Sequence, residues 1–132
     1  MKTYDVIALG ELLIDFAPYS TNEAGYPILS ANPGGAPGNF LAALTKYGHT
    51  TAMIGKVGYD SFGRLLLKTL KDAGIETKGV LMDADVFTTL AFVSLDASGN
   101  RDLSFCSECN LCCWKTTIHK CLTKCLGILC VL

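Results

Sequence analysis

Apolar residues at the start of the chain fall in short runs that glycine, proline or an acidic residue interrupts. Residues 4–9 (YDVIAL) form such a run before Gly10, which predicts a buried strand that ends in a turn. Residues 12–16 predict a second short extended piece, although Asp15 interrupts its apolar face. Residues 17–33 contain several prolines, so we expect a loop or an edge strand there.

Two segments show the spacing of amphipathic helices. In residues 40–47 the apolar positions share one helical face, and Gly48 suits the left-handed conformation that ends a helix. The second helix is expected to end at Gly74, and Asp60 or Ser61 is its candidate N-cap.

The remaining apolar segments predict strands. Residues 50–57 and 77–82 are expected to be single strands, and residues 88–95 and 101–105 are expected to form a hairpin. This order of elements indicates an α/β layer fold with an extra small sheet. The large sheet is incomplete, because two helices do not cover both faces of a doubly wound sheet.

Composition and charge limit the classes of function. The chain has 132 residues, of which 50% are hydrophobic and 17% charged, so we expect one folded domain at most. The net charge is −1 and no basic patch stands out, so nucleic acid is a poor candidate partner. Early carboxylates argue against a signal peptide, and no window approaches the ~20 apolar residues of a membrane span. We therefore expect a cytoplasmic protein without a membrane partner.

Cysteine marks a boundary after Phe105. All 7 cysteines lie in residues 106–132, whereas the first 105 residues hold 12 of the 13 glycines and 11 of the 12 acidic residues. The two parts therefore differ in design, and we expect a domain portion at 1–105 and a cysteine-rich tail at 106–132.

The strongest local signal for chemistry is GGAPGN at the start of the first helix. Gly34 and Gly35 permit backbone angles that other residues avoid, and the helix N-terminus behind them offers unpaired N–H groups. Asn39, on the first turn, both donates and accepts hydrogen bonds, which suits a polyhydroxylated or anionic ligand. A tight strand-to-helix turn without a ligand is the alternative interpretation.

Two other groups gain meaning beside this turn. Asp15 is a carboxylate on an otherwise apolar segment; it is either a surface aspartate at a strand end or an acceptor for sugar hydroxyls. The pattern Gly58-x-Asp-x-x-Gly63 taken alone is a capped turn. Glu11 is expected to be solvated or structural.

Together these motifs resemble the N-terminal signature of the ribokinase-like (PfkB) carbohydrate kinases, and fructokinases in particular. The resemblance covers residues 4–105 and includes VIALGELLIDF, GGAPGN, LTKYGHTTAMIGKVGYDSFG and TTLAFVSLDASGNRDLSF. Leu41 and Gly38 depart mildly from the family pattern. The resemblance implies the N-terminal part of a doubly wound sheet with a β-sheet lid.

The resemblance also implies roles for individual residues. Asp15 and Asn39 would bind sugar hydroxyls, and Gly34 and Gly35 would form the hinge of the lid. Residues 12–30 and 88–105 would build that lid, which forms a dimer interface in some relatives. Phe92 and Phe105 are weaker candidates for lid contacts.

In an intact relative, ATP with Mg²⁺ would convert D-fructose to fructose 6-phosphate; other sugar or nucleoside kinases are the second choice. The family's catalytic Gly-Ala-Gly-Asp and its Asn-x-x-Glu motif do not occur in this chain. The resemblance therefore implies a sugar-binding platform that lacks the catalytic aspartate. We expect poor binding of ATP and Mg²⁺ and no kinase activity from this chain alone.

The tail permits two interpretations. Cys106, Cys109 and Cys112 together with His119 or Cys121 have plausible zinc spacing, which would make the protein a non-catalytic metal- or sugar-binding module. Alternatively, the tail is irregular or helical sequence read out of frame. Cysteine codons shifted back by one base encode Leu, Met or Val, and the shifted tail would carry apolar residues at helical spacing. The DNA sequence after codon 105 decides between them.

Overall fold

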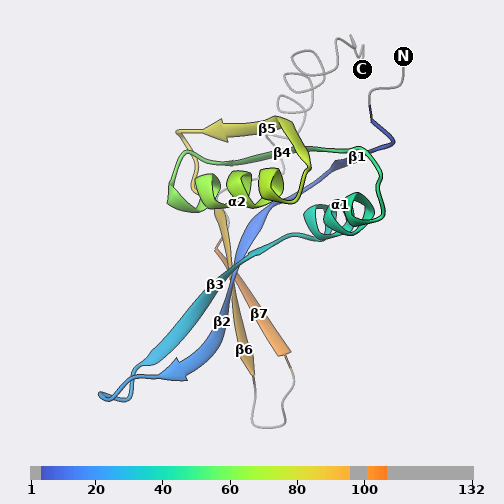
Figure 1. The fold of residues 1–132 in the computed structure, drawn as a ribbon. Helices are drawn as coiled ribbons and strands as arrows, with labels where there is room; N and C mark the ends of the chain where they lie inside the picture. Colours follow the sequence, from blue (N-terminus) through green and yellow to red (C-terminus); the bar gives the residue numbers. More distant parts are fainter. Residues whose placement is uncertain (1–3, 96–100, 107–132) are drawn as a thin grey trace.

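The computed structural model describes residues 4–95 and 101–106, so most of the cysteine-rich tail lies outside the described residues. Seven strands and two helices make up this part (Figure 1). In chain order they are β1 (Val6–Leu9), β2 (Leu13–Thr21), β3 (Pro27–Gly34), α1 (Ala36–Lys46), β4 (Thr51–Gly58), α2 (Ser61–Asp72), β5 (Glu76–Asp83), β6 (Thr89–Leu95) and β7 (Arg101–Cys106).

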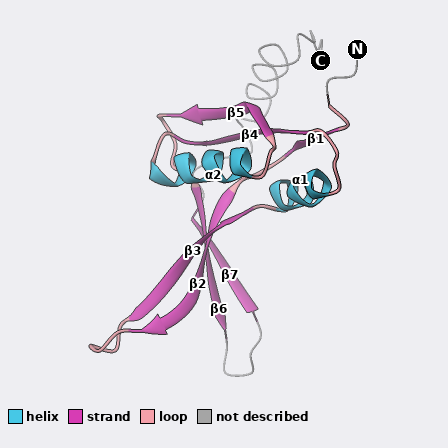
Figure 2. Cartoon of the chain, in the orientation of Figure 1, coloured by secondary structure: helices cyan, strands magenta, loops and turns pink. Residues whose placement is uncertain are grey.

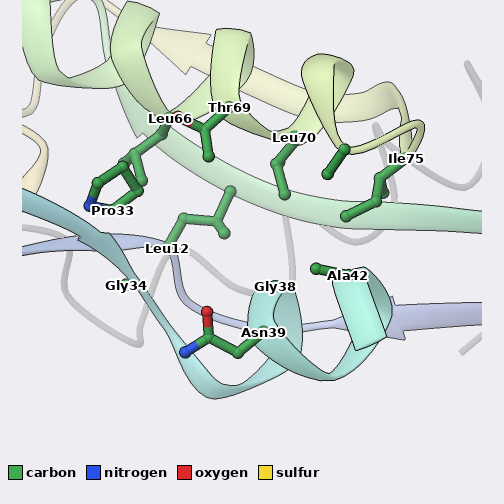
Figure 3. Close-up of a pocket in the computed structure, with 11 residues that line it drawn as sticks. Leu12, Pro33, Gly34, Gly38, Asn39, Ala42, Leu66, Thr69, Leu70 and Ile75 are labelled. Atoms are coloured by element: carbon green, nitrogen blue, oxygen red, sulfur yellow. The ribbon is translucent and has the colours of Figure 1, made fainter. Parts of the chain in front are cut away.

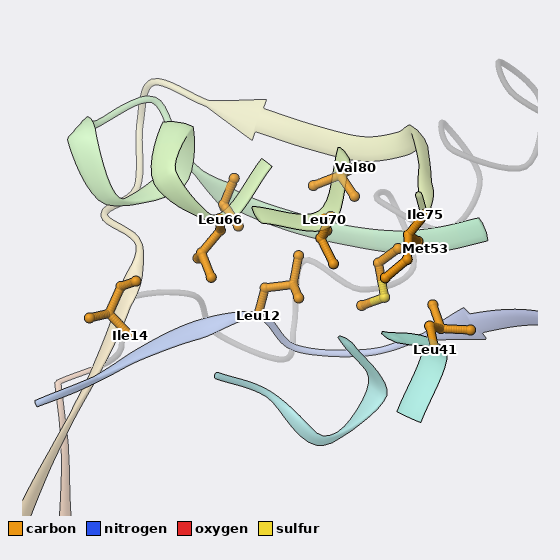
Figure 4. Close-up of a cluster of buried hydrophobic side chains, with 9 residues drawn as sticks. Leu12, Ile14, Leu41, Met53, Leu66, Leu70, Ile75 and Val80 are labelled. Carbon is orange, nitrogen blue, oxygen red and sulfur yellow. The ribbon is translucent and has the colours of Figure 1, made fainter. Parts of the chain in front are cut away.

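Three of the strands form a parallel sheet, which we call the body sheet. Its order is β1-β4-β5, with Ala8 beside Met53 and Gly55 beside Val80. Both helices pack on the same face of this sheet, because Leu41 of α1 and Leu66 of α2 join Met53 in one buried cluster (Figure 4). These three side chains are at most 2% exposed. The apolar stripes that predicted the helices therefore build the core.

The other four strands form a second sheet, which extends away from the body sheet and which we call the lid sheet (Figure 2). Its order is β3-β2-β6-β7, where β2 pairs antiparallel with β3 and parallel with β6. The predicted hairpin is confirmed, since β6 and β7 pair antiparallel along their length. The chain thus enters the lid twice, after β1 and again after β5.

Residues 17–33 are more regular than the sequence led us to expect. β2 continues to Thr21 and β3 begins at Pro27, so this stretch forms two long strands joined by a short turn. The prolines fit because β3 is bonded on one side to β2, and Pro18 lies at a register shift. In the turn, the Asn22 side chain accepts hydrogen bonds from the N–H groups of Ala24 and Tyr26.

The predicted helix ends are confirmed. Gly48 and Gly74 have φ of 87° and 79°, the left-handed conformation that follows a helix C-terminus. Asp60 is the N-cap of α2, and its side chain accepts from the N–H of Gly63 at 2.7 Å. At α1 the N-cap is Gly35, which has a φ of 113°, and Pro37 lies in the first turn of the helix.

At Gly63 we expect the usual effect of a glycine-to-alanine substitution on helix stability to be reversed. In the interior of most helices, this substitution raises the free energy of unfolding by up to about 1 kcal/mol. Here a Cβ on Gly63 would collide with the backbone carbonyl of Gly58, so G63A should lower the free energy of unfolding by more than about 1 kcal/mol. Urea denaturation of the full chain measures it, and a stabilised variant would show that the close approach of α2 to β4 is not maintained.

Neither helix in residues 4–95 and 101–106 is long and apolar enough to cross a membrane.

Candidate functional site

Asp15 lies in β2 at the centre of the lid sheet, close to where this sheet leaves the body. Its neighbours in register are Asn32 on β3 and Ala91 on β6. The carboxylate lies against the backbone of Gly34, because a Cβ on Gly34 would collide with Asp15 Oδ2. Gly34 is therefore glycine for a steric reason, and the structure brings Asp15 and the Gly-Gly turn together.

The Gly-Gly turn leads directly into α1. At Gly35 a side chain is excluded twice: φ is 113°, and a Cβ would lie 2.5 Å from the carbonyl oxygen of Glu11. Asn39 follows on the first turn, where its backbone N–H donates to the Gly35 carbonyl at 3.1 Å. Figure 3 shows Asn39 next to the connection that carries Gly34. Its side chain is exposed at the positive end of the helix dipole.

Asp15 differs from several other carboxylates of the chain in the hydrogen bonds that its side chain accepts. The side chain of Asp5 accepts from Thr50, that of Glu11 from Thr89, and that of Asp60 from Gly63 and Thr88. By contrast, within the part of the chain that the structure describes, neither the Asp15 carboxylate nor the Asn39 carboxamide has a hydrogen-bond partner. Both groups are therefore available to hydroxyl groups of a ligand.

The two candidate lid phenylalanines lie on opposite faces of the lid sheet. Phe105 pairs with Ala91, which pairs with Asp15, so Phe105 shares the face of Asp15 and is 60% exposed. Phe92 is one position further along β6 and faces the other way. Its ring stacks on Phe16 at 5.2 Å, and Phe16 contacts Phe62 of α2 edge-on at 5.6 Å. Phe16 thus packs the lid against the body, and Phe92 supports the Phe16 ring from within the lid.

Asn32 is a further candidate site residue that was not predicted from the sequence. It lies directly opposite Asp15, and its amide donates to Ser30 Oγ at 3.0 Å and to the Asp15 carbonyl at 3.4 Å. The alternation of Ser30, Asn32 and Gly34 in β3 was the signal, since these three share one face. They form a polar strip beside Asp15.

A cavity of about 60 Å³ between α1 and α2 is a separate feature. Asn39, Gly34 and Gly38 reach its edge, but its other lining residues are mainly apolar, and Asp15 is not among them (Figure 3). Ligand sites measure about 300–1,000 Å³. The cavity is therefore a packing gap, and the candidate site lies on the open face at Asp15.

The chain enters the lid at two points, which we call the lid roots: the first precedes β2 and the second precedes β6. Asp60 connects the second lid root to α2. The N–H and hydroxyl of Thr88 donate to its two carboxylate oxygens at 2.8 and 2.9 Å, just before β6 begins. The Thr88 hydroxyl in turn accepts from the N–H of Gly58 at 3.1 Å. One residue on, the hydroxyl of Thr89 donates to Glu11 at 2.9 Å, which joins the two roots of the lid. The Gly58-x-Asp-x-x-Gly63 motif is thus structural: it anchors the lid.

This anchor predicts acid sensitivity. Burial alone would raise the pKa of Asp60, but hydrogen bonds from Thr88 and Gly63 outweigh it and lower the pKa below its ordinary value of 3.8. Because the pKa is lower in the folded state, Asp60 stabilises the protein at pH values above the ordinary 3.8. This stabilisation is lost as the pH falls through the folded-state pKa. We expect the midpoint temperature of thermal unfolding to decrease as the pH is lowered from about 5 to about 2, and to decrease less steeply in D60N. Equal slopes in both proteins would contradict the role of Asp60. Glu76 contributes in the same direction, because hydrogen bonding from Lys78 lowers its pKa.

The candidate metal ligands are mostly outside the described residues. Cys109, Cys112 and His119 fall in residues 107–132, whereas Cys106 ends β7 as an exposed free thiol. Within residues 4–95 and 101–106, no three His, Cys, Asp or Glu side chains converge as a metal site would require.

Comparison with known proteins decides the family. A sequence model described as pfkB family carbohydrate kinase matches residues 3–116, most of the chain. The chain belongs to the pfkB family of carbohydrate kinases. The match runs past residue 105, so the boundary placed there from composition stays a prediction.

Several relatives of this pfkB family chain are fructokinases. It is 43% identical over 102 residues to fructokinase-1 of Oryza sativa subsp. japonica, covering 76% of this chain and 32% of the relative. The crystal structure of Xylella fastidiosa fructokinase matches with a TM-score of 0.71 and 34% identity over 76% of this chain and 31% of that one. That of Vibrio cholerae O395 fructokinase in apo form matches with a TM-score of 0.72 and 28% identity, covering 83% and 36%.

These matches confirm the predicted α/β class and the N-terminal part of a ribokinase-like fold. The chain spans about a third of the length of the curated relatives it matches.

Proposed function

We propose that this chain supplies the sugar-binding platform and lid of a fructokinase-like carbohydrate kinase. The observation that carries the proposal is the Asp15 carboxylate, which lies against Gly34 without a hydrogen-bond partner among the described residues. One carboxylate accepts two hydroxyl groups, which matches neighbouring hydroxyls of a sugar. Asn39, at the N-terminus of α1, provides a donor and an acceptor for a further hydroxyl.

The Gly-Gly turn would act as the hinge of the lid. β3 ends at Gly34 and α1 starts at Ala36, so rotation about Gly35 would swing the lid relative to the body. Closure would bring the lid face with Asp15 and Phe105 over the sugar and exclude water from it. This motion is supported by the two adjacent glycines, Gly34 and Gly35, in the connection between β3 and α1.

We propose D-fructose as the sugar and ATP as the phosphoryl donor of the whole enzyme. Similarity to several fructokinases supports the sugar, and a structure of Xylella fastidiosa fructokinase with bound ATP, at a TM-score of 0.69, supports the donor. Mg²⁺ would neutralise the phosphates. Among the described residues no three His, Cys, Asp or Glu side chains converge, and we propose that these residues bind and orient the sugar.

The chain by itself should not transfer phosphoryl groups. The sequence contains neither a Gly-Ala-Gly-Asp nor an Asn-x-x-Glu motif, so it lacks the base and the metal-organising groups that phosphoryl transfer needs. We expect a coupled assay with D-fructose, ATP and Mg²⁺ to give no ADP release above a protein-free control. Fructose-dependent turnover by the purified chain would contradict this expectation.

A chimeric enzyme tests the positive part of the proposal. Residues 4–105 would replace the corresponding segment of rice fructokinase-1, to which the chain is 43% identical. We expect this chimera to fold and to release ADP in the presence of D-fructose. A chimera that folds and binds nucleotide but shows no preference for fructose over ribose would reject fructose as the substrate.

Two finer features complete the proposal. The lid would pair with a second lid in a homodimer through exposed apolar residues such as Leu103 (46% exposed), and L103K would then shift the sedimentation coefficient towards the monomer.

The protein would work in the cytoplasm, which fractionation of the source cells would test.

A further inference from the structure

Asn32 lies beside Asp15 on the face of the lid sheet that carries the candidate site. The two residues are directly opposed in the pairing of β2 with β3. Side chains of directly opposed residues share a face, and their Cβ atoms lie about 4.5–5.5 Å apart. The two groups are therefore close enough to contact two different hydroxyl groups of one sugar ring.

Hydrogen bonds fix the orientation of the Asn32 carboxamide. Its nitrogen lies 3.2 Å from the carbonyl oxygen of Ser30 and 3.4 Å from that of Asp15. A carbonyl oxygen only accepts hydrogen bonds, so the NH2 group must face these two atoms. The same nitrogen lies 3.0 Å from Ser30 Oγ, and the Ser30 hydroxyl donates to the Ala17 carbonyl at 3.4 Å. The donors of Asn32 and Ser30 are thus engaged within the lid.

The groups that remain for a ligand on this polar strip are acceptors. The carboxamide oxygen of Asn32, an exposed residue, has no hydrogen-bond partner among residues 4–95 and 101–106. The Asp15 carboxylate beside it has none there either. An amide oxygen and an ionised carboxylate only accept, so a ligand must donate to them. Sugar hydroxyls meet this requirement, whereas phosphate and carboxylate groups do not.

The charges in the lid strands also disfavour an anionic ligand. β2, β3 and β6 contain no lysine or arginine, and Asp15 is their one charged residue. β7 contains Arg101, but this residue pairs with Leu95, four positions along β6 from Ala91, the neighbour of Asp15. An anionic group on the strip would therefore face the Asp15 carboxylate without an adjacent cation from these strands to offset the repulsion.

We propose that Asn32 is a specificity residue of the sugar site. With Asp15 it selects neutral polyhydroxylated ligands over sugars that carry a phosphate or carboxylate group on the side facing the lid. Asn39 offers both a donor and an acceptor, whereas Asn32 offers its oxygen alone. This inference rests on the proposed function, since it requires the sugar to lie against Asp15.

Binding titrations of the isotopically labelled full chain, followed by amide NMR, test the role of the Asn32 oxygen. The probes are D-fructose and D-gluconate, because both carry several hydroxyl groups and only gluconate is charged. The unmodified chain should bind fructose more tightly than gluconate. N32A should weaken fructose binding by about three- to tenfold, as expected for the loss of one hydrogen bond between neutral groups.

A gain of affinity for the anion provides a second, independent variant. N32K places a cation on the strip and should reduce the preference for fructose over gluconate at least about tenfold, through a charge-assisted hydrogen bond. A31K is the matched control. Ala31 is exposed on the same edge strand but pairs with Phe16, so its side chain lies on the opposite face. A31K should change the preference by less than about twofold at about 0.15 M salt.

The outcomes separate this inference from the proposed function. If the folded, unmodified chain binds no fructose, or binds it no more tightly than D15A, the proposed function fails and the role of Asn32 with it. If fructose binding depends on Asp15, the role of Asn32 alone is overturned when folded N32A binds fructose like the unmodified chain, or when folded N32K has the preference of A31K. Circular dichroism checks the fold of each variant, and either variant suffices for the test.

Discussion

Replacing Asp15 with alanine in the rice chimera is expected to lower kcat/KM for D-fructose by about 100-fold. A hydrogen bond to a charged group contributes about 1.5–3 kcal/mol, and every 1.4 kcal/mol is a factor of ten. The Asp15 carboxylate is free to form such bonds, because none is made to it by the described residues. The folded structure should be unaffected for the same reason.

Two variants separate a direct role of Asp15 from a general effect on the lid. E23A removes an exposed carboxylate at the tip of the same sheet and should leave kcat/KM unchanged. G34A keeps Asp15 but adds a Cβ where its Oδ2 now lies, so it should displace the carboxylate and reduce kcat/KM as well. Equal activity of D15A and E23A would exclude Asp15 from the sugar site.

Replacing Asp60 with alanine is expected to lower the free energy of unfolding of the full chain by about 2–4 kcal/mol. The variant loses the N-cap of α2, which contributes about 1 kcal/mol. It also leaves the N–H of Thr88, a residue only 2% exposed, without its acceptor, at a further cost of about 1–3 kcal/mol. Urea denaturation followed by circular dichroism measures the change.

The same helix offers a matched control. Asp72 lies at the other end of α2, where it forms an exposed ion pair with Lys68. Exposed pairs of this kind contribute little, so D72A should change stability by less than about 0.5 kcal/mol. If D60A is no more destabilised than D72A, the link between α2 and the second lid root does not hold the fold together.

Local patterns predicted the elements but not all of their partners. The ends of both helices followed from Gly48, Asp60 and Gly74, because caps depend on a few neighbouring residues. The hydrogen bonds between Asp60 and Thr88 span 28 residues and could not be predicted from spacing alone. They exist because the turn after β4 meets the strand that enters the lid.

The lid shows the same limit in another form. The family resemblance suggested Phe92 and Phe105 as lid contacts, but only the pairing register shows that they occupy opposite faces. A shift of one residue would exchange the faces, so composition cannot assign them. Residues 17–33 were uncertain because prolines disfavour central strands, and the edge position of β3 resolves this conflict.

The most direct test of the central claim is a titration of the isotopically labelled full chain with D-fructose, followed by amide NMR. The structure brings Asp15 and the Gly-Gly turn together, so under the proposed function fructose should bind weakly without nucleotide. We predict saturable shifts of the amide signals of Asp15, Gly34, Gly35 and Asn39, which D15A abolishes and E23A preserves. Absence of shifts, or shifts confined to other parts of the chain, would contradict the claim that this segment is a sugar-binding platform.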